Sequence, residues 1–237
     1  MPIPKEMLWQ WAQLPQFKRR VEKAKEVIAE ALAITNNPCV AVSWGKDSIV
    51  MMDLVRSVRP DIYCYCIGDS LEDMQDNYSE VRAKYKAQHP FFNYQTLFYT
   101  EEDEGGFFEV VKKIGKDFDL TFLGCRAQES KGRRMAIKKF GITHTYRSGK
   151  HRCFPLAWWD SKDVWGYLIS QDLPYLRSYD VFGVESRTAV VHNFDLHRGK
   201  HQEYVLASQG AMLKLKIQAP EYFELYRALY PEVSQYV

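Results

Sequence analysis

The chain has 237 residues, of which 46% are hydrophobic, 14% aromatic and 26% charged, and its formal net charge is only +2. This composition belongs to a globular protein long enough to bury a core, and it excludes disordered and collagen-like chains. So small a net charge gives no overall electrostatic preference for nucleic acid or membrane. No apolar run approaches the roughly 20 residues of a membrane helix, so we expect no membrane partner.

Cysteine usage and the first residues bear on the compartment. The five cysteines lack the spacing of a disulfide framework, which favours a reducing environment. The opening stretch MPIPKEMLWQWAQ lacks the apolar core of a secretion signal. We therefore expect a cytoplasmic protein.

Strand and helix patterns alternate along the first part of the chain. Short, continuously apolar runs are typical of strands buried on both faces of a parallel sheet. The expected strands cover residues 39–43, 61–69, 91–98 and 118–124. Apolar residues at helical spacing alternate with these runs. The expected helices cover residues 17–34, 49–58, 71–88 and 106–115. This order predicts an α/β fold with a doubly wound, mainly parallel sheet.

Beyond residue 150 the pattern changes to segments rich in Trp and Tyr. The helices expected there lie near 161–171, 200–215 and 219–229. We predict three parts: an N-terminal helical segment (1–37), an α/β core (38–150) and a mostly helical C-terminal subdomain (151–237). In a doubly wound sheet, ligands bind at the carboxyl ends of the strands, where the strand order reverses. The turns that end there are Ser43–Ser48, Gly68–Ser70 and Gly124–Arg126.

The turn SWGKDS, residues 43–48, has the features of an anion site. We expect Gly45 to adopt a backbone conformation closed to other residues and so to allow close approach to an anion. The amides that open the following helix, with its positive dipole end, attract negative charge. Lys46 adds a charge, and the Ser43 and Ser48 hydroxyls can donate hydrogen bonds. The pattern Gly-x-x-x-x-Gly-Lys-Ser/Thr is absent, which argues against an NTPase of the P-loop type. The alternative is a plain strand-to-helix turn capped by Ser or Asp.

The strand, SWGKDS and the helix together resemble the PP-loop of the N-type ATP pyrophosphatases, whose usual form is Ser-Gly-Gly-Lys-Asp-Ser. This resemblance implies cleavage of an adenine nucleotide between its α and β phosphates. Trp44 replaces the second residue of that form, where an outward-facing aromatic ring could wall the nucleotide pocket.

Two further stretches resemble the phosphoadenosine phosphosulfate (PAPS) reductase family. FLGCRAQESKGRR, residues 122–134, resembles its Gly-x-Arg-x-x-Glu/Ser-x-x-Arg segment. FPLAWWDSKDVWGYLISQDLPYLRSYD, residues 154–180, resembles its long Trp- and Tyr-rich segment. The resemblance spans about residues 38–232. It implies an adenine nucleotide alpha-hydrolase-like fold, with 38–150 as the nucleotide-binding core and the C-terminal subdomain completing the site.

The resemblance also implies roles for particular residues. Lys46, Arg126 and Asp69 are the expected catalytic residues. The expected nucleotide- and phosphate-binding residues are Ser43, Trp44, Gly45, Lys46, Asp47, Ser48, Gly124, Arg126, Glu129, Arg133 and Arg134. Asp47 and Asp69 are candidate ligands for a Mg²⁺ ion brought by the nucleotide.

Reductase chemistry is a separate question. The family's reductases carry a nucleophilic cysteine in a C-terminal Glu-Cys-Gly-Leu-His motif, whereas no cysteine follows Cys153 here. Cys125, beside Arg126, is the candidate thiol. RTAVVHNFDLH, from Arg187, stands where relatives carry paired cysteines, so we expect no iron–sulfur cluster. His192, His197 and His201 lack a completing ligand, and we expect no zinc.

Residues 126–152 are strongly basic, with nine Lys and Arg against one acid, Glu129. Arg126 and Arg134 are expected to clamp an oxyanion. The stretch RSGKHRC (147–153) is expected to be a flexible basic loop. The segment as a whole could serve a nucleotide 3′-phosphate or a nucleic-acid backbone, or it could be a solvated face.

Our leading hypothesis is a PP-loop enzyme that uses ATP or PAPS and cleaves at the α phosphate to adenylate or activate an acceptor. Sulfur transfer and nucleic-acid modification are the outcomes considered, with a nucleic acid or a protein as acceptor and a homo-oligomer as an assembly option. The alternatives are PAPS reduction through Cys125, and a non-catalytic nucleotide-binding partner subunit.

Overall fold

The computed structural model describes residues 4–69, 77–99, 106–176 and 179–180, with 213, 216–217, 220–229 and 234. It divides into two compact units, Pro4–Leu176 on the one hand and Met1–Ile3 with Arg177–Val237 on the other. The second unit contains helix α12 (Pro220–Leu229), which confirms the helix predicted at 219–229. Most of the predicted helix 200–215, and the three histidines at 192, 197 and 201, lie outside the described residues.

The first unit is built on a six-stranded sheet with the order β3-β2-β1-β4-β6-β5. Its strands are β1 (Pro38–Ala41), β2 (Tyr63–Asp69), β3 (Tyr94–Tyr99), β4 (Leu120–Phe122), β5 (Thr143–Thr145) and β6 (His151–Cys153). All neighbouring strands are parallel except β5, which pairs antiparallel with β6. The doubly wound, mainly parallel sheet predicted from the sequence is confirmed.

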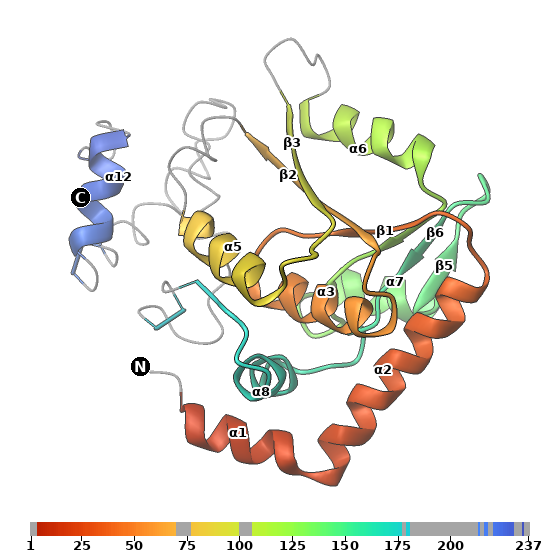
Figure 1. The fold of residues 1–237 in the computed structure, drawn as a ribbon, viewed down its shortest axis with the longest axis horizontal. Helices are drawn as coiled ribbons and strands as arrows, with labels where there is room; N and C mark the ends of the chain where they lie inside the picture. The colour runs from red at the N-terminus through yellow and green to blue at the C-terminus, as the bar shows by residue number, and fades with distance from the viewer. Residues whose placement is uncertain are drawn as a thin grey trace. The chain divides into compact units, whose positions relative to one another are not determined.

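Helices cover both faces of the sheet (Figure 1). Helix α6 (Gly106–Asp117) lies on one face, and α3 (Lys46–Val58) and α5 (Asn77–Gln88) lie on the other. On the α6 face, Val110 and Ile114 pack against Cys39 and Tyr65. Helix α8 (Ser161–Ser170) packs on α3, and α1 (Lys5–Gln13) and α2 (Pro15–Ala33) form the outermost layer. Strand β1 is therefore enclosed on both sides, as its unbroken apolar run predicts.

The order of the strands fixes where a ligand can bind. From β1 the chain steps outward through β2 to β3, and it then returns to place β4 on the other side of β1. The direction of winding therefore reverses between β1 and β4, and crevices for ligands open at the carboxyl ends of strands at such a point. The turn after β1 and the turn after β4 are thus neighbours, as expected.

Four elements of the structure were not predicted from the sequence: α1, α7 (Lys131–Phe140), β5 and β6. The expectation of a flexible basic loop at 147–153 is wrong. The Tyr146 amide donates to the Lys150 carbonyl at 2.8 Å, Gly149 takes φ +77°, and His151–Cys153 is a strand of the sheet. The boundary expected near residue 150 consequently falls inside the first unit. Strands this short carry too few residues for an apolar alternation to appear.

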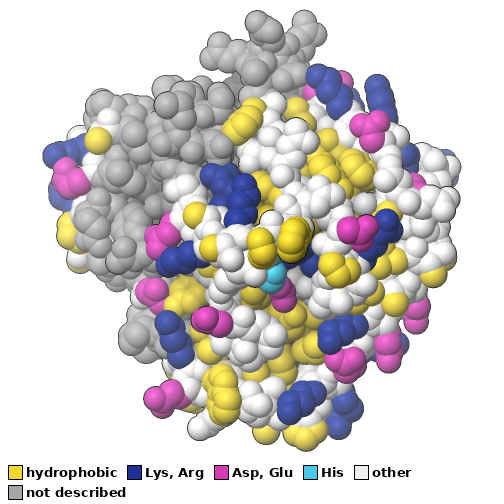
Figure 2. Space-filling view, in the orientation of Figure 1, with side chains coloured by type: hydrophobic (Ala, Val, Ile, Leu, Met, Phe, Trp, Pro, Cys, Tyr) yellow, Lys and Arg dark blue, Asp and Glu magenta, His cyan; other side chains and the backbone are white. Residues whose placement is uncertain are grey.

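The visible surface carries both signs of charge. On the face shown in Figure 2, basic and acidic side chains are interspersed among the described residues, in keeping with the small net charge. Of the helices that the structure describes, none combines the length and apolar character that crossing a membrane requires.

Candidate functional site

The turn after β1 leads directly into α3, whose first residue is Lys46. Gly45 is the N-cap residue, and no side chain caps the helix. The alternative of a Ser- or Asp-capped turn therefore does not describe this helix end. Instead the Ser48 hydroxyl donates to the Gly45 carbonyl at 2.9 Å and accepts from the Ser43 amide at 3.2 Å, which braces the turn from within. The first-turn amides of α3 and its positive dipole end are left for an anion.

The left-handed residue of this turn is Trp44, with φ 56°, whereas Gly45 takes φ −73° and ψ 157°. The expectation that Gly45 needs a conformation closed to other residues is therefore wrong. The Trp44 indole is 1% exposed, and its Nε1 donates to the Tyr94 hydroxyl at 3.0 Å. Its ring also packs edge-on against Tyr85 and Phe92. Since the ring faces this core cluster and not solvent, it does not form the pocket wall considered from the sequence, and only the Trp44 backbone faces the turn.

Three charged groups meet at the start of α3. Asp47 Oδ1 accepts from Arg126 Nε at 2.5 Å, and Asp47 Oδ2 lies 3.1 Å from Lys46 Nζ. Lys46 and Arg126 are both buried. Two buried cations lie beside one carboxylate at a helix N-terminus, and the helix dipole there favours an anion.

Gly124 explains why the two turns approach so closely. A Cβ atom at this position would lie 2.8 Å from the Asp47 carbonyl oxygen and 3.0 Å from Ser48 Cα. Both atoms belong to backbone, which cannot swing aside like a flexible side chain. Position 124 therefore requires glycine for the loop after β4 to sit on the first turn of α3.

A second set of contacts shapes the loop that follows Gly124. Glu129 Oε2 accepts from the Arg126 amide at 2.6 Å and pairs with Arg133, in the first turn of α7. Arg134 Nε donates to the Ala127 carbonyl at 3.4 Å while its side chain remains exposed. Glu129, Arg133 and Arg134 thus lie around the Arg126 loop, as expected of residues near one site.

The Trp-rich segment after β6 supports this loop from behind. The Ala127 amide donates to the Ala157 carbonyl at 2.8 Å, and Arg126 NH1 lies 3.4 Å from the Trp159 carbonyl oxygen. Gln128 Oε1 joins the two segments, since it accepts from Arg126 NH1 at 2.9 Å and from the Ser161 amide at 2.9 Å. Gln128 was not singled out from the sequence, because nothing in a lone glutamine indicates such a bridge.

Of the two expected metal ligands, only Asp47 has its side chain among the described residues. Both oxygens of Asp47 face cations, so this carboxylate does not fit the role of a magnesium ligand here. Asp69 ends β2, but its side chain lies outside the described residues. Across the described ranges, no group of three or more His, Cys, Asp or Glu side chains could hold a metal ion.

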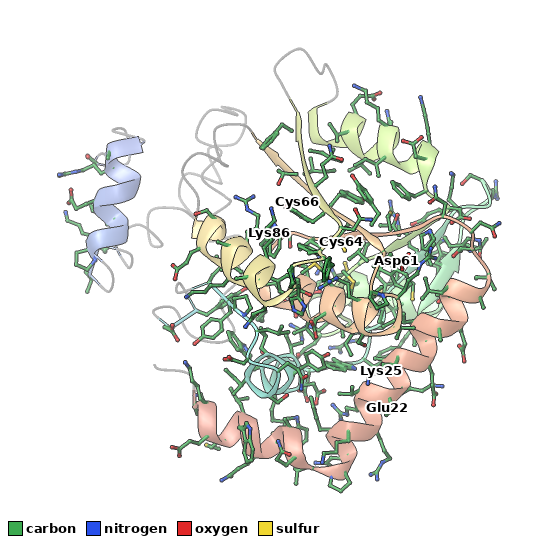
Figure 3. All side chains as sticks on the ribbon, in the orientation of Figure 1. Glu22, Lys25, Asp61, Cys64, Cys66 and Lys86 are labelled. Carbon is green, nitrogen blue, oxygen red and sulfur yellow. The ribbon has the colours of Figure 1, made fainter. Side chains whose placement is uncertain are left out.

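The cysteines are mostly packing residues. Burial raises the pKa of the Cys39, Cys64 and Cys153 thiols to about 12. Cys64 and Cys66 lie along β2 (Figure 3), with Cys64 buried and Cys66 half-buried. Burial also raises the pKa of Cys125, although the guanidinium groups of Arg133 and Arg152 oppose the shift. A thiol with a raised pKa is a poor nucleophile near neutral pH.

The family of the chain follows from comparison with known proteins. The family model described as "Phosphoadenosine phosphosulfate reductase domain" matches residues 37–181. This match takes in β1, the turn at Ser43–Ser48, the Arg126 loop and α8, which are the parts that build the site. The chain belongs to the PAPS reductase family.

Relatives within the family differ in their activities. The chain is 27% identical over 188 residues to an adenosine 5′-phosphosulfate reductase of Geobacillus thermodenitrificans, covering 70% of this chain and 79% of the relative. It is 23% identical over 208 residues to sulfate adenylyltransferase subunit 2 of a Caulobacter species, covering 71% and 68%. Relatives with such different names do not define one reaction.

Solved structures agree on the fold. The Candida glabrata FMN adenylyltransferase in complex with FMN and an ATP analogue superimposes with a TM-score of 0.55 at 13% identity. The likeness covers 75% of this chain and 66% of that one, just under two thirds of its length. Yeast FAD synthetase gives a TM-score of 0.51 at 14% identity, covering 74% and 70%. The expected adenine nucleotide alpha-hydrolase-like fold is confirmed.

Proposed function

We propose that the protein binds an adenine nucleotide at the start of α3 and cleaves it at the α phosphate to activate an acceptor. The observation that carries this proposal is the uncapped N-terminus of α3, with Lys46 beside it and the Arg126 loop packed on its first turn. Such an arrangement binds a polyphosphate and not a neutral ligand. Membership of the PAPS reductase family supports an adenine nucleotide as the source of that polyphosphate.

The reaction we propose is nucleotidyl transfer. A nucleophilic atom of the acceptor attacks the α phosphorus, the bond from that phosphorus to the bridging oxygen breaks, and pyrophosphate leaves with the electron pair. Negative charge grows on the leaving pyrophosphate. Amides fixed in the first turn of α3, together with Lys46, can stabilise this charge without reorganising, which is the efficient form of electrostatic catalysis.

The role that we propose for Arg126 differs from the oxyanion clamp expected from the sequence. Its guanidinium is 3% exposed and is bonded to Asp47, Gln128 and the Trp159 carbonyl. We assign it a positioning role, in which it holds Asp47 and hence the first turn of α3. Arg133 and Arg134, which are exposed at the start of α7, are the arginines we propose for contact with the nucleotide or acceptor.

The test is calorimetric titration of the wild type and Lys46→Ala with ATP–Mg²⁺, PAPS and AMP. Loss of a charge-assisted contact costs about 1.5–3 kcal/mol, so we expect ATP affinity to fall roughly 10- to 150-fold. Lys23→Ala is the matched control, since that lysine is exposed on α2 and pairs with Glu26. Circular dichroism establishes that Lys46→Ala is folded.

The results of the titration distinguish nucleotidyl transfer from PAPS reduction and from a non-catalytic subunit. Tight ATP binding that is lost in Lys46→Ala supports the proposal. Preference for PAPS together with sulfite release abolished by Cys125→Ser would replace it with reduction. Saturable nucleotide binding without formation of AMP, across a broad panel of acceptors, would indicate a non-catalytic subunit. Absence of binding to all three nucleotides would refute the proposal.

A further inference from the structure

A row of three aromatic rings lies at the β5 edge of the sheet, where the end of α7 meets the β5–β6 hairpin. The Phe140 and His144 ring centroids are 4.7 Å apart, and those of His144 and Tyr146 are 4.5 Å apart. Phe140 is 49% exposed and Tyr146 39% exposed. The three residues are separated in sequence, and only the fold makes them continuous. We call Phe140, His144 and Tyr146 the aromatic row.

The row occupies one face of the hairpin. Residues Thr143 and Thr145, which alternate with His144, bond across the other face to Cys153 Sγ and His151 Nδ1. His144 is the cross-strand neighbour of Arg152. The buried side of α7 is taken up by Ile137, which packs with Ala127 and Ala157. No core contact of the described chain therefore accounts for the outward rings of Phe140 and Tyr146.

Cations accompany the row at short range. Lys139 Nζ lies 5.2 Å from the centre of the Phe140 ring, and the Arg152 guanidinium lies 5.2 Å from that of Tyr146. Residues 138–152 contain five Lys and Arg and no Asp or Glu. Among the described residues, none of these five cations forms an ion pair with a carboxylate; they are Lys138, Lys139, Arg147, Lys150 and Arg152. The charge around the row is thus uncompensated, although that of the whole chain is nearly balanced.

We propose that the aromatic row and its cations bind a single-stranded stretch of nucleic acid, with bases stacked on Phe140 and Tyr146 and phosphates held by Lys139 and Arg152. Rings set among basic side chains are how proteins hold single strands without reading their sequence. A protein partner with an acidic surface would meet the cations equally well, but it would leave the exposed rings without a stacking partner.

Arg152, beside the row, lies on β6 opposite Thr121 of β4, the strand that leads into the Gly124–Arg126 turn. Helix α7 begins beside the Arg126 loop, where Arg133 pairs with Glu129, and it ends at Phe140 in the row. A single strand that extends from the row along α7 toward Arg133 would lead to the loop that packs on α3. This makes a nucleic acid the acceptor class, an assignment that rests on the proposed function, whereas the binding itself does not depend on it.

The experiment uses the full chain and fluorescein-labelled decamers of uridine and of thymidine, measured by fluorescence anisotropy. Loss of one base–aromatic stack weakens single-strand binding roughly 5- to 150-fold, so we expect about a tenfold loss for Phe140→Ala or Tyr146→Ala. Phe91→Ala is the matched control, because that ring is 91% exposed and lies before β3. Lys139→Ala and Arg152→Ala should each reduce the slope of log K against log salt by about 0.7.

The controls separate this inference from the proposed function. Lys46→Ala should bind ATP more weakly than wild type and bind the decamers with unchanged affinity. The Phe140→Ala/Tyr146→Ala double variant should show the reverse, with weakened binding of the decamers and unchanged affinity for ATP. Tighter binding of one decamer than the other shows whether RNA or DNA is preferred. The inference is overturned if wild type binds neither decamer, if the double variant binds them like wild type, or if polyglutamate competes as well as unlabelled decamer.

Discussion

At the scale of single residues, the site depends on one close backbone approach. Position 124 brings the loop after β4 onto the Asp47 carbonyl, and only a residue without a Cβ atom fits there. The approach sets the distance from Arg126 to Asp47, and through Asp47 it places Lys46. A small change at position 124 should therefore act on both stability and nucleotide binding.

Gly124→Ala tests this argument. The new methyl group would press on backbone at 2.8 Å, and overpacking of this kind costs about 1–3 kcal/mol. We expect the free energy of unfolding in urea to fall by that amount and ATP affinity to fall with it. The control is Gly115→Ala in α6, where a Cβ meets nothing within 4 Å and helix propensity should add about 0.5–1 kcal/mol. Equal behaviour of the two variants would contradict the packing role of Gly124.

Two opposing effects act at Trp44: the cost of its left-handed backbone and the gain from burying its ring. A left-handed conformation costs a non-glycine residue about 1–2 kcal/mol, which Gly would avoid. Truncating a large buried aromatic ring costs about 3–5 kcal/mol. The burial term is the larger, which accounts for a tryptophan where the usual PP-loop sequence has glycine.

At the scale of elements, α8 is the piece that joins the site to the N-terminal helices. Asp160 and Asp163 form a capping box at its start. Asp163 is fully buried, accepts from Trp11 Nε1 at 3.1 Å and pairs with Arg20. Gly166 lets α1 approach, since a Cβ there would lie 2.9 Å from the Trp11 ring. The segment that most strongly indicated the family thus supports the site mainly by packing.

Asp163→Ala should weaken the packing of the N-terminal helices on α8. Removal of the carboxylate leaves Trp11 Nε1 and the Asp160 amide without their partner and breaks the pair with Arg20, so we expect a loss of about 2–4 kcal/mol in urea unfolding. Asp160→Ala removes the cap and a long, exposed contact of 3.8 Å with Arg20, and it should cost about 1 kcal/mol. If both variants lost the same amount, Asp163 would be acting only as a cap.

At the scale of the whole molecule, buried thiols make stability depend on alkaline pH. The pKa of Cys39, Cys64 and Cys153 rises from 9.0 to about 12 on folding because burial disfavours the thiolate. The folded protein therefore holds these protons at a pH where the unfolded chain has released them. The contribution of these thiols to the free energy of unfolding is fully present below about pH 9, and it is lost as the pH rises from 9 toward 12.

The expected slope is at most about 1.4 kcal/mol per pH unit for each thiol. Urea unfolding at pH 8, 9, 10 and 11 measures it. Cys64→Ala should make the decline shallower, whereas Cys125→Ala should change it less, because the positive charges of Arg133 and Arg152 oppose the rise in the pKa of Cys125. A free energy of unfolding that stays constant above pH 9 would show that these thiols titrate normally.

The sequence by itself determined the order of strands and helices around SWGKDS and the family of the chain. It also determined that the turns Ser43–Ser48 and Gly124–Arg126 lie side by side. These depend on apolar runs and on local motifs, which a linear pattern contains. It could not reveal that Trp44 is left-handed and buried, or that Arg126 is bonded to Asp47 and to the Trp159 carbonyl, because these facts depend on partners far along the chain. Nor could it show the aromatic row. His144 and Tyr146 share a strand face by their spacing, but only the tertiary structure places Phe140, at the end of α7, against His144.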